Sequence, residues 1–456
     1  MKKLILILLL TMTCGLLTIS YSVLATPAFA SNVAVSDAVL QNKNLGEGTI
    51  EIKFTLSQDN TFSGTDDNSA AFYDRIWVLV KYWVVGADSE TTGWHHATLT
   101  TGGTVTPASD GMGAFCSTGA DQVVKWSYAT DSVDAQNTVK VKVCAIEMAY
   151  IPAGSFVYNL GGVGGSTYNN YGAGSQATVS SVSDIPTGAA AGWPNGYSAF
   201  YIAKYEVSQG QYADYLNMLS ASDATSRYTG NYDSSRQSVS YTSGNSYGSR
   251  YAADSSDRGQ NYLSWDDCRA YASWCGLRPL TEMEFEKAAR GGATSSTNVY
   301  PWGEAGPTTT TYTFDVATIS QYYTCYNNTS AGPTDVGHYL SGDIVRTDAQ
   351  TGASIYGVTD LSGNLWEHLI NCAHLSVPSD GNGTLTWPTS WPDAASGKGV
   401  RGGSWGHDAT YLRVSGRGGA GVAGVAGGFV GYIFEVQVHA SPLVCLSIHR
   451  ATASRP

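Results

Sequence analysis

The stretch YLSWDDCRAYASWCGLRPLTEMEFEKAARGG, residues 262–292, decides the fold. It contains two helix starts of one kind, because Ser264 is followed three residues later by Asp267 and Thr281 by Glu284. At this spacing the side chains satisfy free amides of the first helical turn, in a capping box or its Asp variant. The stretch therefore predicts two consecutive helices, the second ending at the closing glycine pair.

A third helix is predicted closer to the N-terminus, in SQGQYADYLNML, where Ser208 is followed by Gln211 at the same spacing. In the helix after Ser264, an apolar stripe of Cys268, Ala272 and Cys275 falls on one face. We expect this face to pack inward. Set among strands and long loops, these helices indicate an α+β fold for the C-terminal part of the chain.

The overall composition limits the classes of protein and partner. The chain has 456 residues, enough for two or three domains. Only 14% of the residues are charged, whereas 52 are glycine and 29 are tyrosine, which favours short strands and polar loops. The formal net charge is -12. A nucleic acid is therefore not an expected partner, because phosphate binding needs a basic surface.

The first thirty residues have the features of a secretory signal peptide. Lys2 and Lys3 precede an apolar run over residues 4–19, and the small-x-small sequence Ala28–Ala30 precedes Ser31. We expect cleavage after Ala30 and a secreted product. No later stretch is apolar and long enough to span a membrane, so a membrane-spanning protein is not expected.

Seven cysteines remain after the signal peptide, and an odd number leaves at least one without an intrachain partner. They are Cys116, Cys144, Cys268, Cys275, Cys325, Cys372 and Cys445. Export makes disulfides possible. Two alternatives stay open for Cys116 and Cys144: a disulfide with each other, or buried free thiols.

The region before residue 148 has a β pattern. GTIEIKFTLS (48–57), RIWVLVKYWVV (75–85) and NTVKVKVCAI (137–146) are β-rich runs separated by Gly, Asp, Asn and Ser clusters. The pattern predicts an all-β, immunoglobulin-like sandwich over residues 31–147. His95 and His96 are expected at a strand edge rather than on a metal.

Two long Tyr/Ser/Gly-rich segments, 159–196 and 226–259, show no periodicity and are expected to form surface loops. Tyrosine interleaved with Ser, Gly and Asn is also the composition of adaptable binding loops.

Five segments occur in an order typical of one family. They are FYIAKYEVSQGQYADYLNML (200–219), the stretch 262–292, YPWGE (300–304), YGVTDLSGNLWEH (356–368) and VRGGSW (400–405). In these motifs the chain resembles the formylglycine-generating enzyme, or sulfatase-modifying factor, family. The resemblance implies an irregular α+β domain related to C-type lectin domains, which we expect over residues 148–440.

The resemblance also implies a structural calcium ion. In the family, the Gly-Asn-x-Trp-Glu block binds calcium, which carries over to the side chains of Asp360 and Glu367 and the carbonyls of Gly363 and Leu365. Calcium prefers six to eight oxygen ligands, which carboxylates flanking a tight turn can supply. The alternative is that the two acids cap the turn without metal. A second calcium is expected among Asp315, Asn327, Asn328 and Asp335, without assigned ligands.

The segment RGGSWGHDATYLRVSGRGG (401–419) departs from the catalytic members. Those members carry two cysteines here, which bind copper(I) and take part in oxidising a substrate cysteine. This chain has His407 and Leu412 around those places, so no copper is expected, because soft thiolates are the ligands for that ion. We instead expect a ligand-binding surface made by Trp405, His407, Asp408, Tyr411 and Arg413. Acid–base or metal chemistry at His407 is the alternative.

Residues 441–456 match nothing in the family and are expected to be a C-terminal tail, or an edge strand able to pair with a neighbour. The whole sequence thus predicts a secreted, non-catalytic binding or structural protein. Its partner would be a glycan, a protein or another copy of the chain. Two alternatives are a formylglycine-generating oxidase and a lectin-type variable ligand-binding protein.

Overall fold

A computed structural model describes residues 33–158, 177–229, 235–292, 300–303, 332–337, 352–409 and 411–416, with backbone segments at 430–431, 434–437 and 450–452. The expected signal peptide (1–30) lies outside the described residues, as do Asp315, Asn327, Asn328, Cys325 and Cys445.

The secondary structure consists of many short strands and four helices in these ranges. The strands are β1 (Ala34–Asn44), β2 (Thr49–Ser57), β3 (Ser63–Thr65), β4 (Ala71–Val84), β5 (His95–His96), β6 (Leu99–Thr100), β7 (Ala114–Cys116), β8 (Gly119–Trp126), β9 (Val139–Ile151), β10 (Phe156–Tyr158), β11 (Ala177–Val179), β12 (Phe200–Ala203), β13 (Val239–Tyr241), β14 (Tyr251–Ala253), β15 (Arg278–Pro279), β16 (Trp366–Ile370), β17 (Lys398–Arg401), β18 (Val430–Gly431), β19 (Phe434–Gln437) and β20 (Arg450–Thr452). The helices are α1 (Gln209–Leu216), α2 (Ala221–Arg227), α3 (Trp265–Trp274) and α4 (Glu282–Arg290). This confirms a mixed α and β fold.

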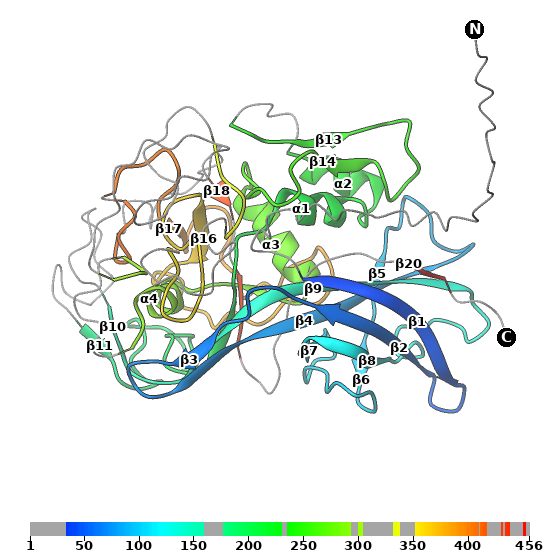
Figure 1. The fold of residues 1–456 in the computed structure, drawn as a ribbon, viewed down its shortest axis with the longest axis horizontal. Helices are drawn as coiled ribbons and strands as arrows, with labels where there is room; N and C mark the ends of the chain where they lie inside the picture. Colours follow the sequence, from blue (N-terminus) through cyan, green and yellow to red (C-terminus); the bar gives the residue numbers. More distant parts are fainter. Residues whose placement is uncertain are drawn as a thin grey trace, which may run out of the picture.

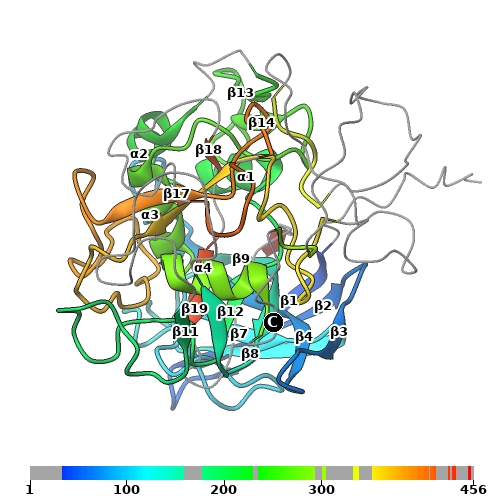
Figure 2. The same ribbon diagram turned by 90° about the vertical axis from the view of Figure 1, so that its left-hand side faces the viewer.

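The centre of the molecule is the long antiparallel pair of β4 and β9, rich in the β-branched and aromatic residues that favour strands. Around it a nine-stranded sheet runs in the order β15-β19-β12-β9-β4-β3, with β5 and β7 also on β4 and β20 on β9. Helices α1, α3 and α4 lie on one side of this sheet and β8 on the other (Figures 1 and 2).

A second, four-stranded sheet has the order β1-β2-β8-β6. On β2, Ile52, Phe54 and Leu56 are at most 2% exposed, while the residues between them are half-buried, as alternation predicts. The expected immunoglobulin-like sandwich is not confirmed. The sheet that faces this one is the large sheet, which continues into the C-terminal part of the chain.

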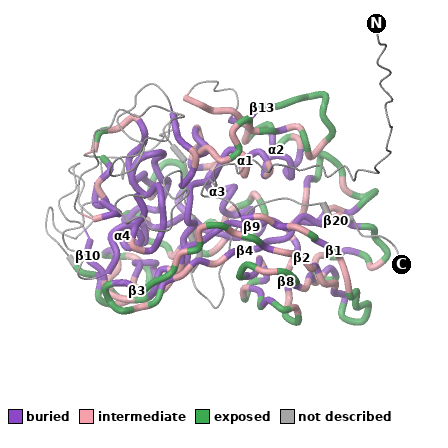
Figure 3. The backbone as a smooth tube through the Cα atoms, in the orientation of Figure 1, coloured by how far each residue is buried: buried purple, intermediate pink, exposed green. Residues whose placement is uncertain are grey.

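Strand β9 joins the two halves of the chain. Its residues Met148–Ile151 pair with β12, while Asp74 and Arg75 of β4 pair with Ala149 and Met148 from the other side. The expected boundary between residues 147 and 148 therefore falls inside one strand. Most buried residues of both halves also belong to one hydrophobic cluster, and Figure 3 shows buried segments in both halves.

The three capping boxes are confirmed. The side chains of Ser208, Ser264 and Thr281 each accept a hydrogen bond from the backbone N–H three residues ahead, and the backbone N–H of each donates to the side chain of that later residue. The face of α3 with Cys268 and Ala272 is fully buried, as expected. No helix in the described ranges is long and apolar enough to cross a membrane.

The five cysteines in the described ranges are buried free thiols. Cys116 lies on β7 opposite Ile76, whereas Cys144 lies on β9 opposite Leu79, so β4 separates them. Strands two positions apart in a sheet lie about 9–10 Å from each other, beyond the reach of a disulfide. Of the two alternatives for this pair, the free thiols hold.

At the end of the chain, residues 450–452 form β20, which pairs with Lys140–Lys142 of β9. This part of the tail covers a strand of its own chain.

Candidate functional site

The loop before β16 is held in a tight conformation. Asp360 and Asn364 have φ values of 59° and 55°, and Gly363 has 88°. The loop is tied to the segment after β17, because Gly363 N donates to Gly402 O at 2.9 Å and Trp405 N donates to Asn364 O at 2.9 Å. The Gly-Asn turn thus holds the loop against the glycine-rich segment that the family resemblance singled out.

A third acidic residue, which sequence reasoning missed, lies at this loop. Glu206 follows β12 and is 1% exposed. Its Oε1 accepts a hydrogen bond from Leu365 N at 2.8 Å, and its Oε2 accepts one from Asn364 Nδ2 at 2.6 Å. The signal in the sequence was an acidic residue between two apolar ones, Tyr205 and Val207, which are both buried. A carboxylate buried with them needs a hydrogen-bond partner or a counter-charge.

Glu367 is the least satisfied group of the site. It is fully buried, and neither carboxylate oxygen has a hydrogen-bond partner in the described chain. Burial, then the nearby charges of Glu206 and Asp360, raise the pKa of Glu367 well above its usual range. Burial and the charge of Asp360 likewise raise the pKa of Glu206.

Asp360 is better satisfied. Its Oδ2 accepts hydrogen bonds from Gly337 N at 2.6 Å and from Thr359 Oγ1 at 3.0 Å. Burial nevertheless raises the pKa of Asp360 to about 6. Three buried carboxyl groups therefore repel one another here, and a divalent cation would cancel this repulsion.

A calcium ion fits this donor set only in part. The orphaned carboxylate of Glu367 and the mutual repulsion favour a cation. However, within the described ranges no three His, Cys, Asp or Glu side chains are grouped so that they could hold a metal ion. A calcium site here would need backbone carbonyls and water as further ligands, which calcium accepts readily. Of the expected ligands, Gly363 and Leu365 lie in the same loop.

The other expected calcium ligand in the described chain, Asp335, lies on the backbone bridge to Arg258. His95 and His96 lie in β5 at the side of β4, as expected for a strand edge. His96 is tied down further, since its Nε2 contacts Met112 O at 2.8 Å and its Nδ1 contacts Lys81 Nζ at 2.9 Å.

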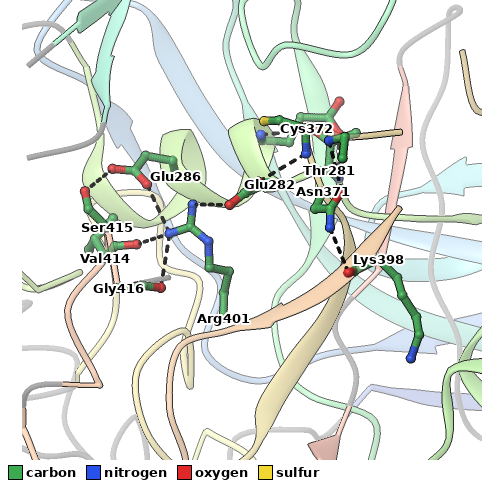
Figure 4. A network of polar contacts seen from close by, with 12 residues as sticks. Thr281, Glu282, Glu286, Asn371, Cys372, Lys398, Arg401, Val414, Ser415 and Gly416 are labelled. Carbon is green, nitrogen blue, oxygen red and sulfur yellow. Dashed lines mark hydrogen bonds and ion pairs between the residues drawn. The ribbon is translucent and has the colours of Figure 1, made fainter. Parts of the chain in front are cut away.

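A buried ionic network holds the glycine-rich segment after β17 against helix α4 (Figure 4). Arg401 contacts Glu282 at 3.1 Å and Glu286 at 3.3 Å, and its NH1 donates to Val414 O at 2.8 Å. Burial alone would raise the pKa of Glu286, but Arg290, Arg401 and a hydrogen bond from Ser415 together lower it to about 2. The network ties residues 414–416 to α4. Sequence patterning did not reveal it, because acids on a helix usually face solvent.

The residues expected to form a ligand-binding surface divide into two groups. Trp405 is 1% exposed and packs on Leu365, so it does not lie on a surface. Tyr411 is 39% exposed and Asp408 is exposed. The structure therefore brings Asp408 and Tyr411 to the outside and turns Trp405 inward.

His407 belongs to a compact group of rings. Its ring centroid lies 5.0 Å from that of Trp366 and 5.0 Å from that of Tyr411, and its Nδ1 is 2.7 Å from Ser404 Oγ. Burial lowers the pKa of His407, while Asp408 opposes this effect. Edge-to-face contacts of this kind hold a ring in place.

Leu412 and Arg413 complete the segment. Leu412 is fully buried, and its carbonyl accepts a hydrogen bond from Ser362 Oγ at 2.5 Å. Arg413 is half-buried, and its Nε is buried without a hydrogen-bond partner in the described chain. Leu412 therefore contributes packing and Arg413 a positive charge, and neither supplies a soft sulfur ligand.

Comparison with known proteins identifies the family. Residues 136–432 match the sulfatase-modifying factor enzyme 1-like domain. The chain belongs to this family. The expected resemblance is thereby confirmed, and the match begins before residue 148, at residue 136, so that it includes all of β9.

Among curated members and relatives of the sulfatase-modifying factor family, the chain is 30% identical to "Inactive C-alpha-formylglycine-generating enzyme 2" of Bos taurus, over 30% of this chain and 39% of that protein. It is 33% identical to "Hercynine oxygenase" of Mycobacterium tuberculosis, over 24% of this chain and 21% of that protein. It is 34% identical to "Formylglycine-generating enzyme" of Thermomonospora curvata, over 23% of this chain and 31% of that protein. The chain thus spans less than half the length of each of these three relatives.

Among solved structures, "Structure of PvdO from Pseudomonas aeruginosa" matches 64% of this chain and 95% of that chain, at 20% identity and a TM-score of 0.34. The names of the curated relatives include both an inactive protein and enzymes, so membership of the sulfatase-modifying factor family does not by itself assign an activity.

Proposed function

We propose that this chain is an exported, non-catalytic binding or structural protein built on a sulfatase-modifying-factor domain. The observation that carries the proposal is the pair His407 and Leu412. Resemblance to the catalytic members places the two copper-binding thiols around these positions. Here a half-buried imidazole is packed among rings, and a fully buried leucine offers no ligand.

The binding role rests on what the same segment offers to a partner. Asp408 and Tyr411 are exposed, and Arg413 has an unsatisfied buried Nε. In a domain of the C-type-lectin type, a rigid scaffold presents such groups on loops. The proposed partner is a glycan, a protein or a second copy of this chain.

A structural calcium at Asp360 and Glu367 belongs to this proposal, with Glu206 as an additional acid. When bound, calcium supplies charge neutralisation for the buried carboxylates. Glu206 meanwhile holds the loop through Leu365 N and Asn364 Nδ2.

The test is a copper assay on the full chain. We expect that stoichiometric copper(I) is not retained in the presence of a thiol competitor, and that a cysteine-containing peptide is not oxidised faster than without protein. Restoring sulfur with the double substitution His407→Cys and Leu412→Cys should raise copper retention. Retention and peptide oxidation by the unsubstituted chain would instead establish the alternative, a formylglycine-generating oxidase.

Export is tested separately. Expression of the chain in a host with a secretory pathway should give extracytoplasmic protein whose N-terminal residue is Ser31. Material that stays in the cytoplasm with residues 1–30 attached would contradict that part of the proposal.

A further inference from the structure

Two acidic side chains share one face of the central strand pair. In the antiparallel register of β4 and β9, Asp74 stands opposite Ala149, and Glu147 stands opposite Ile76. Opposite residues point to the same face, and every second residue along a strand returns to it. Asp74 and Glu147 are therefore diagonal neighbours on one face. Diagonal positions are about 7–8 Å apart, a distance that a long side chain such as that of Glu147 can span.

One lysine lies with these two acids. The Nζ of Lys204, directly after β12, donates to Asp74 Oδ2 at 2.6 Å, and its backbone N donates to the backbone O of Glu147 at 3.0 Å. Phe62 N donates to the same Asp74 oxygen at 2.7 Å. The single ammonium group compensates the charge of Asp74. If Glu147 also ionised, its charge would be buried without a counter-charge of its own, which is costly.

Four buried polar atoms at this place have no hydrogen-bond partner in the described chain. They are Asp74 Oδ1, both carboxyl oxygens of Glu147 and the hydroxyl of Tyr205. The side chain of Asp74 is 2% exposed, and Glu147 and Tyr205 are 3% and 6% exposed. Two ionised carboxylates are acceptors only, and the Tyr205 hydroxyl has one proton to donate. One additional proton would satisfy the whole set.

The groups that face Glu147 favour this additional proton. Burial raises the pKa of Glu147 to about 8, while the charge of Lys204 opposes the rise and that of Asp74 adds to it. The nearby hydroxyl of Tyr205 also opposes the rise, and Asp59, in the loop after β2, adds to it. Glu147 is therefore mainly protonated at neutral pH.

We propose that Glu147 and Asp74 share one proton, and that this proton stabilises the packing of β4 and β9 on the segment that follows β12. The protonated carboxyl group of Glu147 donates to Asp74 Oδ1, and its other oxygen accepts from the Tyr205 hydroxyl. All four unpartnered atoms then have partners, while Lys204 holds the second oxygen of Asp74. In alkaline solution Glu147 releases the proton to solvent, and two carboxylates then face one lysine. The pair is independent of the function proposed for the segment 405–413.

The first experiment is urea denaturation of the full chain as a function of pH. The folded pKa of Glu147, about 8, lies above its ordinary value of 4.5, so the folded chain holds more protons than the unfolded chain between these values. Stability should therefore fall as pH rises from about 4.5 to about 8. Glu147→Gln provides a neutral amide that can donate to Asp74 and accept from Tyr205 at every pH. The urea midpoint of the parent should fall across this range relative to that of Glu147→Gln.

The second experiment detects the proton directly. A protonated carboxylic acid has an infrared C=O stretching band that a carboxylate lacks. The difference spectrum between the parent and Glu147→Gln cancels the other carboxyl groups. It should contain this band at neutral pH and lose it as pH rises through about 8, where Glu147 ionises.

Two further variants complete the design. Tyr205→Phe removes a group that opposes the rise in pKa, so the acid band of Glu147 should disappear at a higher pH than in the parent. This shift can be measured even if Glu147→Gln does not fold. The matched control is Glu47→Gln, which removes an acid that pairs with Lys125 at 2.6 Å and has a 57% exposed side chain. It should keep the acid band and the pH profile of the parent.

Three results would overturn the proposal. They are the absence of the acid band from the difference spectrum of the folded proteins at neutral pH, parallel pH profiles of the urea midpoint for the parent and Glu147→Gln, and a band that disappears at the same pH in the parent and Tyr205→Phe.

Discussion

The carboxylate of Glu367 lies directly against the backbone of Gly402. A Cβ atom on Gly402 would stand 2.1 Å from Glu367 Oε2, and the φ of Gly402 is +87°. Glycine is required here for two reasons, because the acid leaves no room for a Cβ and because other residues rarely adopt this conformation. The acid in β16 and the glycine after β17 thus form one structural unit.

The first prediction follows from this contact. Gly402→Ala should lower the free energy of unfolding by about 2–4 kcal/mol, from the strained φ and from displacement of Glu367. Chemical denaturation measures it. Gly86→Ala is the matched control, because Gly86 has φ +88° but nothing within 4 Å of its Cβ position. Equal losses in both variants would show that the contact with Glu367 does not matter.

The second prediction concerns calcium. A chelator should lower the melting temperature, and saturating calcium at 100 times its Kd should restore about 2.7 kcal/mol of stability. Glu367→Gln should remove most of this difference, because it takes away a charged ligand without changing the shape. The control Glu51→Gln, on the partly exposed strand β2, should keep the stability difference between calcium and chelator. A melting temperature indifferent to calcium in the parent chain would argue for a metal-free turn.

The third prediction concerns the buried Lys81, which connects strand β4 to the C-terminal part of the chain. Its Nζ donates to Trp274 O at 2.7 Å and to Gly383 O at 2.8 Å, and it lies 2.9 Å from His96 Nδ1. Lys81→Met leaves these acceptors without their donor and should lower the free energy of unfolding by about 2–4 kcal/mol.

The control for Lys81 is Lys53→Met. Lys53 forms an exposed pair with Asp121, with side chains 38% and 72% exposed. It should change stability by about 0.5 kcal/mol or less. If both substitutions have small effects, the two parts of the chain do not depend on this contact.

The fourth prediction is a loss of stability in acid. The pKa of Glu286 is lowered from 4.5 to about 2, so its contribution is present above its unfolded pKa and is lost as pH falls through the folded one. The shift corresponds to about 3 kcal/mol, lost between roughly pH 5 and pH 2. Glu286→Gln should be less stable at neutral pH and lose less on acidification, as measured by urea denaturation across this range. A parallel pH profile for parent and variant would contradict the assignment.

Several elements could be predicted from sequence because they depend on neighbours a few residues apart. The capping boxes at Ser208, Ser264 and Thr281 are confirmed in this way. The alternation of β2 is confirmed as well. Glu206 was missed, because the groups it binds, Asn364 and Leu365, are more than 150 residues away in the chain.

The orientation of Trp405 was likewise beyond local patterning. The motif places it among glycines, where exposure is plausible, but its burial depends on Leu365 from another segment. The domain boundary has the same cause: the sequence pattern places the end of the β-rich region at residue 147, whereas β4 and β12 hold β9 as one strand through that position.

The sequence by itself determined the helix starts, the strand-rich N-terminal part and the lack of any cysteine between Cys372 and Cys445. These are matters of short-range hydrogen bonding and of chemical inventory. Only the tertiary structure decided which acids surround Glu367 and which aromatic side chains are buried. The reason is that burial and electrostatic coupling depend on distances between segments remote in the chain, which local preferences do not set.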